Sequence, residues 1–182
     1  MAKFLYSVAM SLDGFIAGPG GDMSWLTPYE EPNPAVDELI TRTAVILVGK
    51  RTFGGDDPLK GQPGEGEAFG GGWVGPQFVL THRPPAESVP GVTFVDDIDT
   101  AIAASREAAG DRYVNILGAN VAAQCLRAGV LDEVMVIVTP VMLGDGTRLF
   151  EHPGGETVRL EQLSVTHTKQ VTNLWYRIVG SD

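Results

Sequence analysis

The sequence predicts an α/β fold, and three features of it carry that prediction. Residues 113–139 read as a strand, a glycine turn, a helix and a second strand, which is about the shortest unit able to link parallel strands by a crossover. Residues 44–48 form a continuous apolar run, a pattern typical of a strand in a sheet that is covered on both faces. Residues 158–166 and 173–179 read as two closing strands, which the turn at 168–172 makes antiparallel.

The other elements follow from local signals. Asn33 is a good helix N-cap and is followed by Pro34, a residue favoured at the first helical position. Gly110 ends a second helical pattern, and Gly129 can end the helix that begins near Val121. The apolar periodicity therefore predicts, in chain order, a strand at 3–10, a helix at 34–43, strands at 77–80 and 92–95, and a helix at 97–109.

Composition limits the classes of function. The chain has 182 residues, 20% charged and 43% hydrophobic, which fits one folded domain spanning 1–182. Its net charge of −10 argues against binding to nucleic acid or to an anionic membrane surface. No apolar run is long enough to span a membrane, and no signal peptide is recognisable. A lone cysteine, Cys125, cannot form an internal disulfide, so we expect a cytoplasmic protein in which this thiol is inert core.

One long stretch carries no periodic signal. Residues 54–73 are rich in glycine, proline and acidic residues. We expect either a disordered insertion or a lid here, and we assign no chemistry to it.

Polar and cationic residues follow three predicted strands. Gly49, Lys50, Arg51 and Thr52 come after the first, and Thr81, His82 and Arg83 after the second. After the third, Gly118 and Ala119 form a turn of small residues into a helix whose free N–H groups attract anions. Because arginine and threonine donate well to phosphate oxygens, these strand ends indicate a phosphate-bearing ligand.

Four segments together resemble a known family. They are SLDGFIAG at 11–18, ILVGKRTF at 46–53, ILGANVAAQCLRAGVLDEV at 116–134 and TPVMLGDGTRLF at 139–150. The chain resembles the dihydrofolate reductase superfamily, and within it the branch of the C-terminal domain of the bacterial riboflavin-biosynthesis reductase. This resemblance covers nearly the whole chain. It implies a dihydrofolate-reductase-like three-layer fold, with a mostly parallel central sheet, antiparallel C-terminal strands and flanking helices.

The resemblance also implies NADPH, laid across the strand ends. The first cationic group would meet the adenosine phosphates, and the second would suit a ribose 2′-phosphate. Residues at two further places would complete the cofactor site, namely the pyrophosphate turn Gly118, Ala119, Asn120 and Val121, and the backbone of Ala9 and Ile16 at the nicotinamide amide. The family's usual Gly-Gly at this turn is Gly118-Ala119 here.

The substrate side is left with alternatives. Glu30, a few residues after Trp25, resembles the carboxylate of dihydrofolate reductases, whereas Asp13 lies where riboflavin reductases use an acid, and Asp37 is a third candidate. The resemblance further implies substrate contacts from Trp25, Phe53, Val141, Leu143 and Gly144. The histidines His82, His152 and His167 show no ligand spacing, so no metal is expected.

The expected function is that of an NADPH-dependent reductase, which transfers hydride to a C=N or C=O of a small pyrimidine- or pteridine-like heterocycle. The resemblance points to a 5-amino-6-ribosylaminouracil phosphate reductase of riboflavin biosynthesis. A true dihydrofolate reductase and an NADPH-binding protein without efficient catalysis are the alternatives. The branch commonly forms homodimers through sheet edges.

Overall fold

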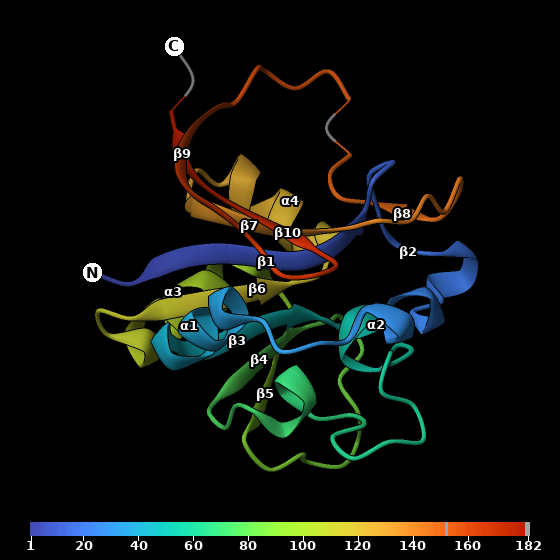
Figure 1. Cartoon of the computed structure of the whole chain (residues 1–182). Helices are drawn as coiled ribbons and strands as arrows, with labels where there is room; N and C mark the ends of the chain where they lie inside the picture. The colour runs from blue at the N-terminus through green and yellow to red at the C-terminus, as the bar shows by residue number, and fades with distance from the viewer. Residues whose placement is uncertain (152, 181–182) are drawn as a thin grey trace.

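A central sheet of eight strands organises the molecule (Figure 1). The computed structural model describes residues 1–151 and 153–180. From β5 to β7 all neighbouring strands are parallel, and β10 and β9 are antiparallel additions at one edge, which confirms the predicted fold class. In spatial order the strands are β5 (Val92–Val95), β4 (Gln77–Leu80), β3 (Thr43–Gly49), β6 (Tyr113–Leu117), β1 (Lys3–Ser11), β7 (Leu131–Thr139), β10 (Thr172–Val179) and β9 (Arg159–His167).

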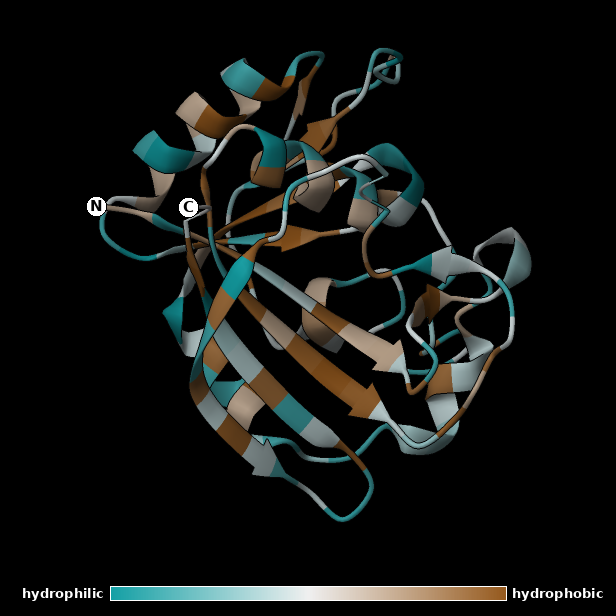
Figure 2. Ribbon diagram, turned by 90° about the horizontal axis from the view of Figure 1, so that it is seen from above, coloured by the Kyte–Doolittle hydropathy of each residue, from teal (hydrophilic) through white to brown (hydrophobic). Residues whose placement is uncertain are grey.

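Helices cover both faces of this sheet. Because side chains alternate along a strand, Phe4 and Tyr6 of β1 point to one face and Leu5 to the other. The first face packs against α3 (Ile98–Ala109) and α4 (Ala119–Arg127). The second packs against α1 (Pro34–Arg42) through its one fully buried residue, Leu39. Figure 2 shows hydrophobic residues running along the central strands between these layers.

The helix ends use the signals that the sequence predicted. Asn33 accepts a hydrogen bond from the backbone N–H of Ala35 at 3.2 Å, with Pro34 at the first position of α1. Asp97 caps α3 by accepting from the N–H of Thr100 at 2.8 Å. Gly110 follows α3 with a φ of +64°, a conformation that favours glycine.

The remaining elements are short and lie near the carboxyl-terminal ends of the parallel strands. β2 pairs with β8 as a separate antiparallel ribbon. The bounds are β2 (Phe15–Ala17), η1 (Pro19–Gly21), η2 (Ser24–Tyr29), α2 (Lys50–Phe53), η3 (Ala68–Gly71) and β8 (Thr147–Arg148). No helix in the described part of the chain is both long and apolar enough to cross a membrane.

Residues 54–73 are held to the core at their end, so the expectation of a disordered insertion is wrong. Trp73 is only 8% exposed, and its Nε1 donates to the carbonyl oxygen of Thr43 at 3.1 Å. Phe69 packs against the same cluster as Ile46 and Val79. A segment with no periodic pattern is thus ordered by two aromatic residues near its end.

Candidate functional site

A cleft of about 1890 Å³ opens along the carboxyl-terminal ends of β1, β3, β4 and β6. It is bounded by α1, η2, the segment after α2, and the start of α4. Of the residues predicted to bind a cofactor, all but Arg83 line it: Ala9, Ile16, Gly49, Lys50, Arg51, Thr52, Thr81, His82, Gly118, Ala119, Asn120 and Val121. The fold therefore brings three separate strand ends to one surface.

The end of β3 presents exposed cations. Lys50, Arg51 and Thr52 are exposed on the short α2 turn. The Lys50 ammonium lies 5.8 Å from the ring centres of Phe53 and Phe94, whereas the Arg51 guanidinium makes no ion pair within the described residues. An unpaired guanidinium at a cleft edge can accept a phosphate with bidentate geometry.

The turn from β6 into α4 approaches α2 closely. Gly118 has a φ of +96°, and a Cβ there would lie 2.5 Å from Oγ1 of Thr52. A Cβ on Gly49 would lie 3.2 Å from Cγ2 of Val121. These two glycines leave a backbone cradle between the β3 and β6 ends, beside the free N–H groups at the start of α4.

The end of β4 contributes the second group. Thr81 is buried, and its Oγ1 accepts from the backbone N–H of Arg83 at 3.1 Å, which fixes the turn. His82 is exposed and lines the cleft. Arg83 is exposed but does not line it.

The three candidate carboxylates have different surroundings. Glu30, at the end of η2, and Asp37, on α1, line the cleft, and Asp13 does not. Partial desolvation and the charge of Asp57 raise the pKa of the Glu30 carboxyl, although part of the residue stays exposed. A carboxyl with a raised pKa keeps its proton at higher pH than an ordinary one and is suited to proton donation.

Asp13 instead joins two loops. Its carboxylate accepts from Ser11 Oγ at 2.6 Å and from the backbone N–H groups of Leu143 and Gly144 at 3.0 and 2.7 Å. The hydrogen bond from Ser11 is the main cause of the lowered pKa of Asp13, and the two backbone donors add to it. A carboxylate held ionised in this way orders the loop rather than releasing a proton.

The predicted substrate contacts are only partly brought together. Phe53 lines the cleft, but Trp25, Val141, Leu143 and Gly144 do not. The O of Val141 accepts from the N–H of Leu12, so residues 141–144 sit against the turn after β1. Gly146, further along the same loop, does line the cleft, and a Cβ there would lie 2.0 Å from the O of Ala17.

Sequence reasoning missed much of the cleft wall. Residues 54–60 and 65–70 line it, as do Gln124 and Arg127 of α4 and Arg148 of β8. The acidic character of 54–67 was visible in the sequence, but nothing local indicated that it faces a cleft. Within the described residues no cluster of three or more His, Cys, Asp or Glu could hold a metal ion, and His152 lies outside them.

Comparison with known proteins agrees with this geometry. Residues 2–174 match the RibD C-terminal domain family. An uncharacterised Bacillus subtilis protein, YwjB, is 26% identical over 171 residues, covering 92% of this chain and 91% of its own.

Two solved structures share the fold. One is a Shewanella protein with a proposed role in riboflavin biosynthesis, with a TM-score of 0.74, 23% identity, and coverage of 99% of this chain and 100% of that one. The other is the dihydrofolate reductase of Enterococcus faecalis in complex with NADP(H), with a TM-score of 0.63, 16% identity, and coverage of 97% and 96%. The fold is thus that of the dihydrofolate-reductase-like proteins.

Proposed function

Because the chain belongs to the RibD C-terminal domain family, we propose that it is an NADPH-dependent reductase of a small pyrimidine- or pteridine-like heterocycle. The observation that carries this proposal is the convergence of three phosphate-suited strand ends on one cleft. The first and third groups meet at the cradle of Gly49 and Gly118, and the second reaches the same cleft through Thr81 and His82.

The residues present fit NADPH. Lys50, Arg51 and Thr52 would bind adenosine phosphates, and the Gly118 turn with the start of α4 would hold the pyrophosphate. His82, with the turn that Thr81 fixes, would meet the ribose 2′-phosphate. Ala9 and Ile16 line the far part of the cleft, where the nicotinamide would lie. When bound, NADPH would supply a hydride to a C=N or C=O carbon of the substrate.

The protein's own part is binding, shielding and proton delivery. Glu30 is the proposed proton donor to the substrate nitrogen or oxygen, since it lines the cleft and has a raised pKa. Asp13 is a positioning residue in this proposal, because it fixes the loop that leads to Gly146 and β8. The lone buried Cys125 supports the cytoplasm as the proposed location.

The test is a titration of the purified protein with NADPH and with NADH. We expect a preference for NADPH of tenfold or more, which corresponds to about 1.4 kcal/mol. The His82→Ala variant should lose part of that preference while its NADH affinity stays the same. Absence of binding by either nucleotide would defeat the proposal.

We also propose a homodimer formed through the β9 edge of the sheet. All nine residues of β9 are exposed, and Leu160, Leu163 and Val165 are 49, 38 and 49% exposed. An uncovered apolar edge strand is a common site of pairing. Sedimentation equilibrium should give a dimer mass for the native chain and a monomer mass for Val165→Asp, and a monomeric native chain would refute this proposal.

A further inference from the structure

The charged residues that line the cleft are segregated. The proposed cofactor half, at the ends of β3, β4 and β6, carries Lys50, Arg51, His82 and Arg127. The other half lies between α1, η2 and residues 54–70, and we call it the substrate half. Its charges are mainly negative, which is not what a phosphorylated substrate requires.

Five carboxylates form what we call the acidic wall of the substrate half: Glu30, Asp56, Asp57, Glu65 and Glu67. The segment that carries four of them is tied to η2. Asp56 accepts from the N–H of Met23 at 3.1 Å, and Thr27 Oγ1 donates to the O of Pro58 at 2.7 Å. The influence of Asp57 on Glu30 shows that the two sides of this wall lie close to each other.

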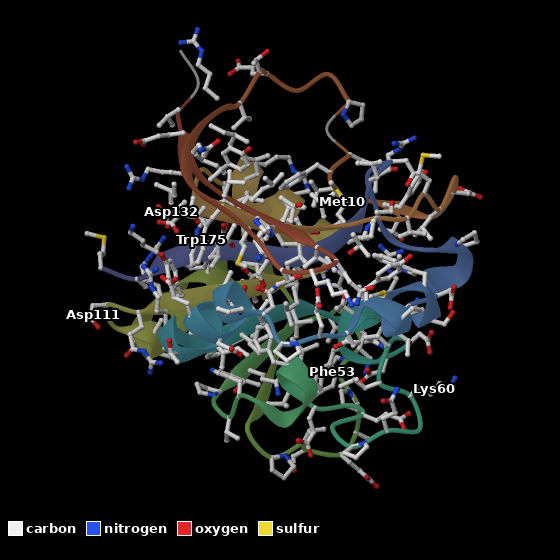
Figure 3. The ribbon with its side chains drawn as sticks, in the orientation of Figure 1. Met10, Phe53, Lys60, Asp111, Asp132 and Trp175 are labelled. Carbon is white, nitrogen blue, oxygen red and sulfur yellow. The ribbon has the colours of Figure 1, made fainter. Side chains whose placement is uncertain are left out.

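The cations nearby do not neutralise the wall. Lys60 lies 3.6 Å from Asp56, its side chain is 76% exposed, and Figure 3 shows it at the outer edge of the segment. Arg148 lies over the ring of Phe15 at 4.7 Å, on the β2–β8 ribbon. In the described part of the chain, five wall carboxylates therefore face one peripheral lysine.

The floor of this half offers neutral hydrogen-bonding groups. Ser7 lines the cleft and donates to Oδ1 of Asn115 at 2.8 Å, and Asn115 is 0% exposed. Its Nδ2 has no hydrogen-bond partner among the described residues. Asn33 also lines the cleft and forms reciprocal bonds with Asn173. A buried donor without a partner is costly, and an acceptor on a neutral ring would offset that cost.

We propose that the substrate half selects an uncharged heterocycle and disfavours one that carries a phosphate or carboxylate tail. The acidic wall repels an anionic tail, and the neutral floor suits the amide-like edges of a pyrimidine or pteridine ring. This inference rests on the proposed function, since it assigns the other half to the cofactor. It narrows that function away from phosphorylated aminouracils and from folates, whose glutamate tail is anionic.

The test uses a matched pair of probes, 5-amino-6-ribosylaminouracil and its 5′-phosphate, titrated into the NADPH-saturated protein. NADPH binding is measured first on the same sample, so that failure of the proposed function is seen separately. We expect the unphosphorylated probe to bind at least about tenfold more tightly at low salt, with the difference shrinking as salt is added. Equal affinities, tighter binding of the phosphate, or no binding of the neutral probe would each overturn the inference.

A charge-neutral variant identifies the cause. Glu65→Gln/Glu67→Gln keeps side-chain size, and a glutamine oxygen can still accept the hydrogen bond that Glu65 accepts from the N–H of Gly61. This variant should bind the phosphorylated probe about threefold or more tightly than the native chain does, with the neutral probe unchanged. The control is Asp99→Asn/Glu107→Gln, which removes two exposed charges from α3 on the opposite face of the sheet. An equal gain in both variants would also overturn the inference.

Discussion

At the amino-terminal end of the parallel strands Glu133 is buried and fully paired, whereas at their carboxyl-terminal ends Arg51 and His82 stand exposed. Glu133 is 1% exposed and accepts from Lys3 Nζ, Tyr113 OH and Trp175 Nε1, each at 2.8 Å. Figure 3 shows Trp175 and Phe53 toward the two different ends of the sheet. Charges at one end are spent on holding strands together, and those at the other remain available to a ligand.

This contrast teaches how one sheet can serve both stability and binding. Burial alone would raise the pKa of Glu133, but hydrogen bonds from Lys3, Tyr113 and Trp175 outweigh it and hold the pKa below its usual range. The ionised form is therefore the one that stabilises the fold. At the cleft, by contrast, a burial effect is left uncompensated at Glu30, where it suits a proton donor.

The largest expected effect is on stability. Glu133→Gln should lower the free energy of unfolding by about 3–5 kcal/mol, because it breaks a buried charge network. The measurement is denaturant unfolding at neutral pH. Since the folded pKa is lowered, this loss should be full above about pH 4.3, the ordinary pKa of glutamate, and should shrink as pH falls through the folded pKa.

Its control is Glu161→Gln, which breaks the exposed pair with Arg177 at 2.9 Å. That change should cost less than about 1 kcal/mol. Similar losses in the two variants would remove the distinction between buried and exposed charges on which the comparison rests.

The next effect is catalytic. Glu30→Gln should lower kcat/KM for hydride transfer by about 100-fold, the lower end for a general acid. In the native enzyme the rate should fall as pH rises through the raised pKa of Glu30, and the variant should lose that dependence. Asp37→Asn, which also changes a carboxylate in the cleft, is the control and should keep the native pH profile. An unaltered profile in Glu30→Gln would assign the proton to another group.

A smaller effect is expected on cofactor binding. Arg51→Ala should weaken NADPH by about 1.5–3 kcal/mol through loss of a charge-assisted phosphate contact. Isothermal titration would measure it. Arg83→Ala removes a neighbouring exposed cation that does not line the cleft and should change the dissociation constant little. If both variants bound NADPH equally, the net charge and not the site would be responsible.

The smallest expected effect distinguishes backbone strain from cleft geometry. Gly118→Ala should cost about 1–2 kcal/mol of stability for its left-handed φ and should also weaken NADPH, because the new Cβ meets Thr52. Gly110→Ala has a φ of +64° with nothing within 4 Å, so it carries strain alone. An NADPH affinity that is equal in the two variants would refute the cradle.

The sequence predicted every strand and helix of the main sheet layers because those signals are local. Apolar period, Asn33 as a cap and Gly110 as a stop are read within a few residues. It also predicted which strand ends would supply polar groups, because parallel strands place their carboxyl ends together. These are properties of single elements or of the fold class.

The cleft wall could not be predicted in this way. The position of residues 54–70 depends on Trp73 reaching Thr43 and on Asp56 reaching Met23, contacts between distant parts of the chain. In the same way, Asp13 finds its partners at Leu143 and Gly144, 130 and 131 residues away. No local pattern distinguishes an acid that donates a proton from one that orders a loop.

The burial of Cys125 has a practical consequence. Its thiol is 0% exposed within the core, and desolvation raises its pKa to about 12. Because thiolates are the reactive form, maleimide reagents should leave the folded native chain unlabelled. A cysteine introduced at the exposed Lys60 would then take a single fluorophore, and movement of the acid-rich segment during turnover could be followed without first deleting a native thiol.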